Sequence, residues 1–406
     1  MSREADSSGK RYQTTNGDEK TVEDHFQTSG VITMAAGHAV HDTYTAFLPP
    51  LLPAFIANLA LTRTAAGLLT VFIQSPSLIQ PAIGHLADRV DLRYLVILAP
   101  AVAATMMSLL GVAPGYAVLA LLLIVVGCSS AGLHAVGPVM AGRLSGRNLG
   151  RGMSFWMVGG ELGRTLGPIV VVTAVVHLTI RGMPWLMIGG LLASVVFYLR
   201  LRSVSARPEE VQEGFPWRLA LRRMRPVLAP LAGVILLRSF LHVALTIYLP
   251  VFLTEEGADL WFAGASLTVL QAAGIVGALL GGSISDRMGR RFVLLVSMTM
   301  APLFMFVFLA VHDWTQFFVL LLLGLFVIST TPVMMAIVQE SFPENRALAN
   351  GTYMSLSFLI RSGAVVLLGV LGDHLGLRLA FAGSAVAMLL GLPLLFLLPQ
   401  RHSKTT

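Results

Sequence analysis

Long apolar segments alternate with short polar breaks along almost the whole chain. A helix that crosses the bilayer core needs about 20 predominantly apolar residues. Twelve segments of suitable length lie between polar breaks, so the pattern predicts twelve membrane-spanning helices. Their ranges are 30–57, 64–85, 94–112, 116–140, 150–177, 183–200, 226–253, 261–283, 292–311, 315–340, 348–372 and 378–398.

The composition agrees with a protein that is solvated mainly by lipid. Of the 406 residues, 55% are hydrophobic and 12% are charged, whereas soluble domains carry about 25% charged residues. A soluble fold has too little interior to bury so much apolar surface. The sequence therefore predicts an all-α polytopic membrane protein. It contains no phosphate-binding loop, zinc-protease motif or serine-hydrolase motif, so we expect no enzyme, no cofactor and no metal site.

Basic residues in the connections lie almost entirely on one side of the predicted spans. The connections on the other side hold only Arg63, Arg181 and Arg378. Because basic loops stay in the cytoplasm, this asymmetry predicts that both termini are cytoplasmic. It also accounts for the net charge of +7, so we expect the partners to be the lipid bilayer, protons and a small molecule, and not nucleic acid.

The longest internal break divides the spans into six and six. The sequence predicts a disordered cytoplasmic tail at 1–29, a six-helix bundle at 30–200, a second bundle at 226–398 and a cytoplasmic tail at 399–406. Residues 201–225 are predicted to be a cytoplasmic linker whose basic second part forms an amphipathic helix on the membrane surface. We expect a monomer, and no cleavable signal peptide, because no basic stretch leads into a short apolar segment at the start.

Two pairs of segments repeat across this division. Segment 84–93 follows the second span and segment 282–291 follows the eighth, with Gly, Asp, Arg and a final Arg at the same offsets. In addition, His41 precedes Pro49 by the spacing with which His242 precedes Pro250. Matching repeats indicate a duplicated architecture. The prolines predict a break in the hydrogen-bond ladder of the first and seventh spans.

The repeated loops resemble the signature loop of the major facilitator superfamily, G-x-x-x-D-R-x-G-R-R. The second copy fits fully, and the first has Asp91 where the family has glycine. The resemblance implies two pseudo-symmetric six-helix bundles and a conformational latch in these loops; a plain topology-setting loop is the alternative. We expect the first glycine of each copy to permit close helix approach. The latch residues would be Gly84, Asp88, Arg89, Arg93, Gly282, Asp286, Arg287, Gly289, Arg290 and Arg291.

Three further stretches, 38–53, 132–134 and 158–168, resemble the fosmidomycin-resistance family of bacterial proton-coupled drug exporters within that superfamily. The last stretch also resembles part of the superfamily's antiporter motif, G-x-x-x-G-P, from Gly163 to Pro168. The glycine pair that follows in the full motif is absent. The resemblance implies proton-coupled antiport and a place in the bacterial cytoplasmic membrane.

Ionisable side chains inside the predicted spans mark the candidate site, because such groups are costly in a bilayer and usually functional. The interiors of spans 3, 6, 9 and 12 contain none, and the superfamily resemblance places these spans against lipid. The ionisable residues lie in spans 1, 4, 5, 7 and 11. They are His38, His41, Asp42, His134, Glu161, Arg164, Arg238, His242 and Arg361.

Helical spacing places His38, His41 and Asp42 on one face of the first span. A carboxylate beside histidines can take up and release a proton as its surroundings change between wet and dry. We therefore predict these three residues as a proton relay, with Glu161 as a second candidate.

Arginine forks suit phosphate, phosphonate and carboxylate groups. The arginines in the spans outnumber the two carboxylates, which predicts an anionic or amphiphilic organic substrate. A structural Glu161–Arg164 ion pair and a satisfied interior His134 are the alternatives. The predicted substrate-binding residues are Arg164, Arg238, His242, Arg361 and His134.

Three functions fit these observations: a proton-coupled exporter, a symporter or uniporter that imports a metabolite, and a non-transporting membrane receptor or scaffold on the same fold. Titratable groups at membrane depth favour transport over a scaffold. The partial antiporter motif and the family resemblance favour export. We therefore expect proton-coupled efflux of a small anionic or amphiphilic compound.

Overall fold

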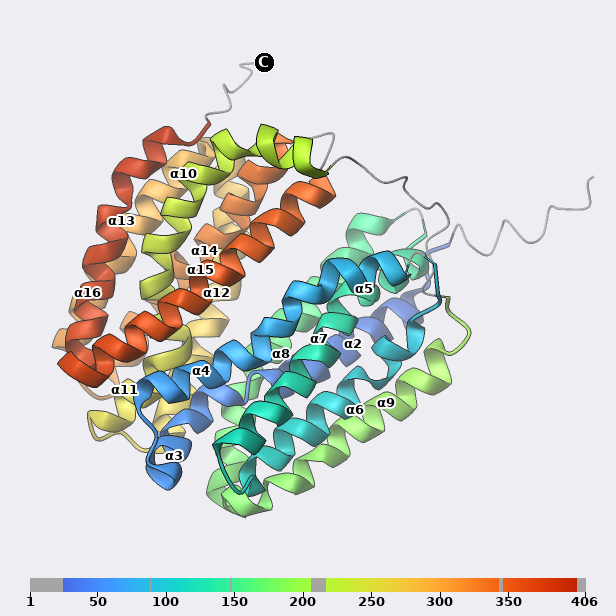
Figure 1. Cartoon of the computed structure of the whole chain (residues 1–406), viewed down its shortest axis with the longest axis horizontal. Coiled ribbons are helices and arrows are strands. Elements are labelled where there is room, and N and C mark those ends of the chain that lie inside the picture. Colours follow the sequence, from blue (N-terminus) through green and yellow to red (C-terminus); the bar gives the residue numbers. More distant parts are fainter. Residues whose placement is uncertain (1–24, 88, 147, 206–216, 343–345, 400–406) are drawn as a thin grey trace, which may run out of the picture.

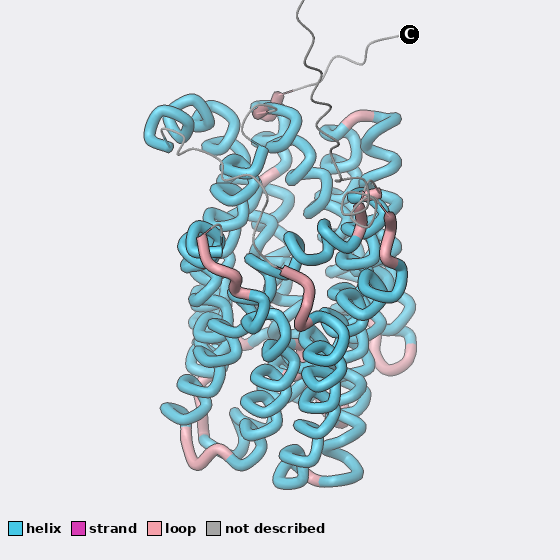
Figure 2. Tube along the Cα trace, turned by 90° about the vertical axis from the view of Figure 1, so that its right-hand side faces the viewer, coloured by secondary structure: helices cyan, strands magenta, loops and turns pink. Residues whose placement is uncertain are grey.

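The computed structural model describes residues 25–87, 89–146, 148–205, 217–342 and 346–399, and all regular structure within these ranges is helical. Figure 2 shows that most helices run in broadly one direction. The first half contains α2 (Thr28–Thr45), α3 (Leu48–Leu59), α4 (Arg63–Gln74), α5 (Gln80–Ala87), α6 (Arg93–Leu109), α7 (Tyr116–Leu144), α8 (Leu149–Leu178) and α9 (Met187–Leu201). The second half contains α10 (Trp217–Val243), α11 (Leu249–Glu255), α12 (Leu260–Met288), α13 (Arg290–Ala310), α14 (Thr315–Ser341), α15 (Arg346–Leu375) and α16 (Leu377–Leu390).

Eleven helical segments in the described ranges are long and apolar enough to cross a membrane. The remaining predicted span is the pair α2 and α3, which a turn at Ala46 and Phe47 divides. The 18-residue α2 carries ionisable residues, and these lower its hydropathy. The prediction of an all-α fold with twelve spans in two six-helix bundles is confirmed.

In the first and seventh spans, regular α-helical hydrogen bonding is interrupted at matching places. Pro49 and Pro50 lie in the first turn of α3, and Pro250 lies in the first turn of α11. A π-helical turn, Ala244–Tyr248, separates α10 from α11. Proline has no N–H to continue the ladder of a helix, so the predicted breaks in the first and seventh spans are confirmed.

The two halves are separate bundles that touch near one end (Figure 1). Between them, α4 packs on α15, α8 on α12, and α3 on α11. We name the end of the bundles at Arg63 and Leu375 the contact end. We name the opposite end, where α9 ends and α10 begins, the linker end. Figure 1 shows the bundles diverging toward the linker end.

A stripe of glycines holds α8 tightly against α2. Gly159, Gly163 and Gly167 follow one another at intervals of four residues, which places them on one helix face. A Cβ atom at any of the three would overlap a backbone carbonyl oxygen of α2. Small residues allow such close helix approach in membranes, and this contact brings the side chains of α8 within reach of those of α2.

Replacing Gly163 with valine is expected to lower the free energy of unfolding by about 1–3 kcal/mol, because the new side chain would overpack a tight contact. A Cβ at Gly163 would meet the carbonyl oxygen of Ala39 and the Cβ of Asp42. Thermal unfolding of the purified protein in detergent measures the effect. Gly363→Val is the control, because a Cβ at Gly363 has no atom within 4 Å. Equal unfolding temperatures for the two variants would contradict the close contact.

The close approach expected at Gly84 and Gly282 is wrong, because a Cβ at either position has open space around it. On α12, which leads into the second copy, the glycines that contact α14 are Gly274, Gly277 and Gly281. Successive helical residues point about 100° apart. Gly282 therefore faces away from the contact that its neighbour Gly281 makes.

The basic helix predicted within the linker is the first part of α10 and not a separate element. This helix runs without interruption from Trp217 to Val243, and Pro226 and Pro230 lie within it. Figure 1 shows its beginning across the linker end of the second half before the helix turns into the bundle. Of the predicted tails and linker, residues 1–24, 206–216 and 400–406 lie outside the described residues.

Candidate functional site

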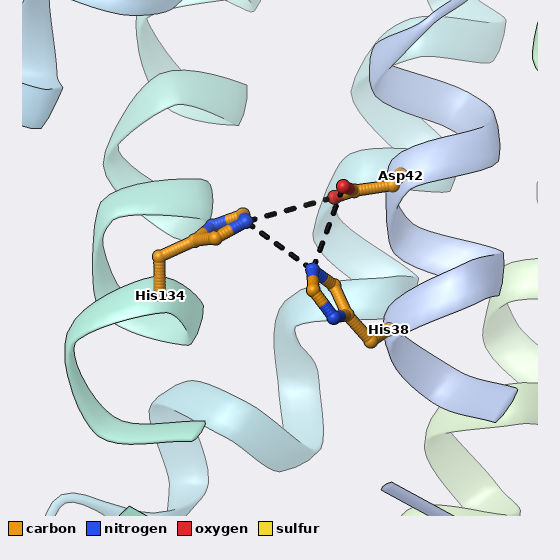
Figure 3. Close-up of side chains that lie close together, drawn as sticks. All are labelled: His38, Asp42 and His134. Atoms are coloured by element: carbon orange, nitrogen blue, oxygen red, sulfur yellow. Dashed lines mark hydrogen bonds and ion pairs between the residues drawn. The ribbon is translucent and has the colours of Figure 1, made fainter. Parts of the chain in front are cut away.

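Three helices of the first half bring six of the nine predicted ionisable side chains together. Figure 3 shows three of them, with the side chains of Asp42, His38 and His134 facing one another. The six residues, from α2, α7 and α8, are His38, His41, Asp42, His134, Glu161 and Arg164. We call this group the α2–α7–α8 cluster.

Asp42 is the centre of the cluster, and its side chain is only 3% exposed. Arg164 donates a hydrogen bond from Nη1 to Oδ2 at 2.7 Å. Nδ1 of His41 lies 2.9 Å from Oδ1, and because a carboxylate accepts, this nitrogen is the donor. These two partners compensate the carboxylate for the hydration that it loses on burial.

Arg164 links the buried carboxylate to a more accessible one. Its Nη2 donates to Oε1 of Glu161 at 2.5 Å, so the Glu161–Arg164 ion pair that the sequence allowed as an alternative is formed. The side chains of Arg164 and Glu161 are 39% and 35% exposed, respectively. One guanidinium fork therefore joins an acid that is almost sealed from solvent to an acid that solvent can reach.

His38 and His134 are both oriented by backbone carbonyls. Nδ1 of His38 lies 2.9 Å from the carbonyl oxygen of Trp156, and Nδ1 of His134 lies 2.8 Å from that of Ser130. Since a carbonyl can only accept, both Nδ1 atoms carry the proton. The Nε2 atoms of the two rings lie 3.3 Å apart.

Sequence reasoning missed both of these orienting residues. Trp156 also stacks on the ring of His38, with centroids 3.9 Å apart. The four-residue spacing from Ser130 to His134 places both on one face of α7, and this spacing was a usable signal. No sequence spacing connects Trp156 with His38, because the two residues lie on different helices.

Three atoms of the cluster have the chemistry of metal ligands. Nε2 of His38, Nε2 of His134 and a carboxylate oxygen of Asp42 lie within 4.8 Å of one another. Nε2 of His38 lies 3.5 Å from Oδ2 of Asp42, and Nε2 of His134 lies 3.9 Å from Oδ1. Imidazole nitrogen and carboxylate oxygen both bind divalent transition metals.

The other three predicted residues lie in the second half and do not join the cluster. Arg238 is 6% exposed and donates to Thr330, to Thr331 at 2.6 Å and to the carbonyl oxygen of Val327. These partners, all on α14, are neutral. They therefore satisfy hydrogen bonds of the arginine without compensating its positive charge.

Arg361 of α15 reaches across to the first half, where it donates to the side-chain oxygen of Gln74 at the end of α4. This partner is also neutral. His242 of α10 has a buried Nδ1 for which the described residues provide no hydrogen-bond partner. The second half thus presents two arginines with neutral partners and one unsatisfied imidazole nitrogen.

The second signature loop forms a charge network within its own half. Arg290 pairs with Asp286 at 2.5 Å and with Glu340 of α14 at 2.9 Å. Arg291 donates to the carbonyl oxygen of Leu398. Gly289 has φ of +95° between α12 and α13, in the left-handed region that favours glycine, so the family's glycine has a backbone reason here. Arg287 is exposed.

The first signature loop is built differently where Asp91 replaces that glycine. The carboxylate of Asp91 accepts from the backbone N–H of Arg93 at 3.1 Å and pairs with its side chain at 3.3 Å. Arg93 also donates to the carbonyl oxygen of Arg202. Arg89 is exposed, and Asp88 lies outside the described residues. In both copies, these contacts are made within one half.

The fold and the site define a polytopic membrane transporter with two helical halves and ionisable side chains at membrane depth. The family model of the Major Facilitator Superfamily matches residues 34–288 and 262–406. The chain therefore belongs to the major facilitator superfamily, as the signature loops predicted.

Two relatives resemble the chain over nearly its whole length. The fosmidomycin resistance protein of Escherichia coli (strain K12) is 25% identical over 385 residues, which is 93% of this chain and 94% of that protein. An uncharacterized MFS-type transporter of Bacillus subtilis (strain 168), YfnC, is 26% identical over 394 residues, 94% of this chain and 96% of that protein. Both identities are modest.

Solved structures support the fold. A bacterial homolog of the human lysosomal transporter Spinster, in an inward-facing and unoccupied conformation, superposes with a TM-score of 0.77 at 13% identity. The same homolog in an inward-facing and occupied conformation gives 0.76 at 13% identity. Each match covers 92% of this chain and 96% of the other. At this identity the likeness shows the shared architecture alone.

Proposed function

We propose that this transporter exports a small anionic or amphiphilic organic compound in exchange for protons. The observation that carries the proposal is the bridge in which Arg164 joins the buried Asp42 to the more exposed Glu161. Through this bridge, protonation of the buried acid changes the ion pairing of an arginine that solvent and substrate can reach. The likeness to the fosmidomycin resistance protein supports efflux.

The proton relay in this proposal comprises Asp42, His38 and His41, with Glu161 as the accessible acid. A proton on Asp42 removes the charge that attracts Arg164. The guanidinium then interacts with Glu161 alone, and its second pair of N–H donors becomes available. Charge compensation inside a low-dielectric site makes such a change of partner energetically large.

The arrangement of arginines supports an anionic substrate. With neutral histidines, the α2–α7–α8 cluster and the two arginines of the second half hold three positive and two negative charges. One anion would neutralise the excess. Arginine offers five donors in a planar fork that matches carboxylate, phosphate and phosphonate groups, so Arg164, Arg238 and Arg361, with His242 and His134, form the proposed binding set.

We further propose that the linker end faces the bacterial cytoplasm. Most basic residues of the connections lie between helices at this end, and the positive-inside rule assigns such connections to the cytoplasm. In that orientation the contact end closes the outer side of the membrane, while the bundles diverge on the inner side. The structure would then correspond to an inward-facing state, ready to take up a substrate from the cytoplasm.

Import by symport is the second candidate, because one electrostatic observation favours it. A proton in the α2–α7–α8 cluster adds positive charge, and this strengthens the attraction for an anion. Such coupling favours binding of the two together, as in symport, unless the partner change of Arg164 reverses the sign. The direction of proton movement therefore distinguishes the two candidates.

Proton flux in proteoliposomes tests the proposal. We would reconstitute the protein with a pH-sensitive dye inside the vesicles and add small carboxylates and phosphonates to the outside. Exchange predicts that substrate entering the vesicle drives protons out, so the lumen becomes more alkaline. Acidification of the lumen would support symport instead. No proton movement with any substrate that demonstrably accumulates would overturn proton coupling, and absence of all flux would favour a scaffold.

Replacing Arg361 with glutamine is expected to weaken binding of the transported anion by roughly 10- to 100-fold, because hydrogen bonds to charged groups are worth about 1.5–3 kcal/mol. Thermal shift with increasing anion concentration measures the change. Arg378→Gln is the matched control, since Arg378 pairs with Glu256 at the contact end. Equal affinities in the wild type and Arg361→Gln would remove Arg361 from the binding set.

A further inference from the structure

The imidazoles of His38 and His134 point their Nε2 atoms toward the carboxylate of Asp42 (Figure 3). We propose that these three groups form a binding site for a divalent transition metal ion of the zinc type. The site goes beyond the proposed transport function, because its occupancy can be measured without any substrate or flux. Three independent features of the geometry carry the inference.

The first feature is the protonation pattern of the two rings. Both Nδ1 atoms donate to backbone carbonyls, of Trp156 and Ser130, so in the neutral rings both Nε2 atoms are lone-pair acceptors. These acceptors face each other at 3.3 Å, a repulsive arrangement that a cation relieves. Histidines that bind metals typically donate their other ring N–H to a carbonyl or carboxylate in this way.

The second feature is the spacing of the three atoms. Zinc binds nitrogen and oxygen at about 2.0–2.2 Å in tetrahedral geometry, so its ligands lie roughly 3.3–3.5 Å apart. The separations here are 3.3 Å between the two Nε2 atoms, 3.5 Å from Nε2 of His38 to Oδ2 of Asp42 and 3.9 Å from Nε2 of His134 to Oδ1 of Asp42. One carboxylate oxygen lies within 4.8 Å of both nitrogens. A rotation of the Asp42 carboxylate together with a small shift of His134 would bring one oxygen into reach of both nitrogens, complete three ligand positions and leave the fourth open.

The third feature is charge and access. With neutral histidines, the α2–α7–α8 cluster holds two carboxylates and one guanidinium, which leaves one negative charge for a cation to balance. The side chain of His134 is 29% exposed, whereas that of His38 is 4% exposed. An ion can therefore approach along His134 and reach the buried ligands behind it.

The ligand set also indicates which ions bind. Two imidazoles and one carboxylate suit zinc, cobalt, nickel and copper, whereas magnesium and calcium prefer oxygen ligands throughout. Because the ligands include residues of the proposed proton relay, a bound metal would occupy the atoms that a proton needs. Metal and proton would then compete for one site.

Cobalt titration of the full-length protein tests the site. We would purify the protein in detergent, remove metals with a chelator and follow visible absorption as Co²⁺ is added, since tetrahedral cobalt absorbs far more strongly than six-coordinate cobalt. The expected result is one equivalent of tetrahedral Co²⁺, which Zn²⁺ displaces and Mg²⁺ does not. His134→Asn should reduce the absorption at least tenfold.

The controls separate this site from adventitious binding and from unfolding. His85→Asn and His177→Asn remove exposed histidines and should leave the absorption unchanged. Asp42→Asn is a second ligand variant, and thermal unfolding of each metal-free variant verifies that it is folded. The proposal is overturned if the wild type gives no tetrahedral band, if both ligand variants keep the full band, or if either surface variant loses it. These readouts do not depend on transport, so a failure of the metal site leaves the proposed function intact, and the reverse also holds.

Discussion

Replacing Asp42 with asparagine is expected to abolish transport driven by a pH gradient, with a loss of at least tenfold in initial rate. Asparagine has nearly the same shape as aspartate and keeps an oxygen to accept from Arg164, but it cannot bind and release a proton. The Asp42 side chain is almost completely buried, so water cannot take over the proton binding that the carboxylate provides. Arg164 retains its pair with Glu161, and we therefore expect the variant to fold.

Substrate-coupled proton flux in proteoliposomes measures this effect, and a thermal shift with substrate shows whether binding survives. Glu161→Gln is expected to have a smaller effect, because Glu161 is one-third exposed and water can take over part of its role. Asp313→Asn is the matched control, since Asp313 is exposed and its left-handed φ of +57° is one that asparagine tolerates. Undiminished pH-driven transport by Asp42→Asn would remove Asp42 from the relay.

Much of the fold could be predicted from the sequence because a bilayer imposes simple rules. Apolar length marks a span and basic residues mark one side of the membrane. The matched positions of Pro49 and Pro250 located the breaks in two helices. The first span was predicted correctly, although its site residues lower the hydropathy of α2 below that of the other spans.

The site could be predicted only within single helices. Helical spacing grouped His38 with Asp42, and Glu161 with Arg164, because neighbours on a helix face lie three and four residues apart. The bond between Arg164 and Asp42 depends on how α8 packs against α2, and no local spacing encodes it. Likewise, the bond from Arg361 to Gln74 arises only when the two halves meet.

The expected close contact at Gly84 and Gly282 failed for a related reason. A motif identifies a glycine, but the rotation of the helix decides whether it faces a neighbour. At Gly281 a Cβ would meet Ser329 of α14, and one residue later it would meet nothing. Motif resemblance therefore located the loop correctly and gave an incorrect reason for its first glycine.

Replacing Asp373 with alanine is expected to open the contact end. Asp373, in α15 of the second half, accepts from the backbone N–H groups of Arg63 and Thr64 at 2.7 and 3.0 Å and from the hydroxyl of Thr64 at 2.6 Å. It thus caps the start of α4 in the first half. The first N–H groups of a helix have no partner within it, and the helix dipole favours a negative charge there.

The cap is a strong link between the halves because it uses charge-assisted hydrogen bonds. Loss of an N-cap costs about 0.5–2 kcal/mol, and one to two kcal/mol changes an equilibrium roughly 5- to 30-fold. In this structure, in which the two halves meet at the contact end, Arg63 also pairs with Glu255 of α11 at 2.8 Å. Opening the contact end breaks both links, so their loss favours the state in which that end is open.

Electron–electron distance measurements between spin labels would detect this shift. The labels would replace Asn58 and Leu375, which are exposed residues of different halves near the contact end, after the exposed Cys128 is changed to serine. Asp373→Ala should move the distance distribution toward longer values. Glu255→Gln, which breaks only the pair with Arg63, should move it in the same direction by less.

Glu256→Gln provides the decisive comparison because Glu256 lies next to Glu255 but pairs with Arg378 at 3.0 Å, within the second half. Its loss removes a surface ion pair at the same end without breaking a link between the halves. We therefore expect no change in the label distances. If this variant shifts the distribution as much as Asp373→Ala does, general weakening of the contact end explains the opening, and the cap on α4 has no special role. If only the two variants that break links between the halves shift it, the halves are held together at this end by the start of α4.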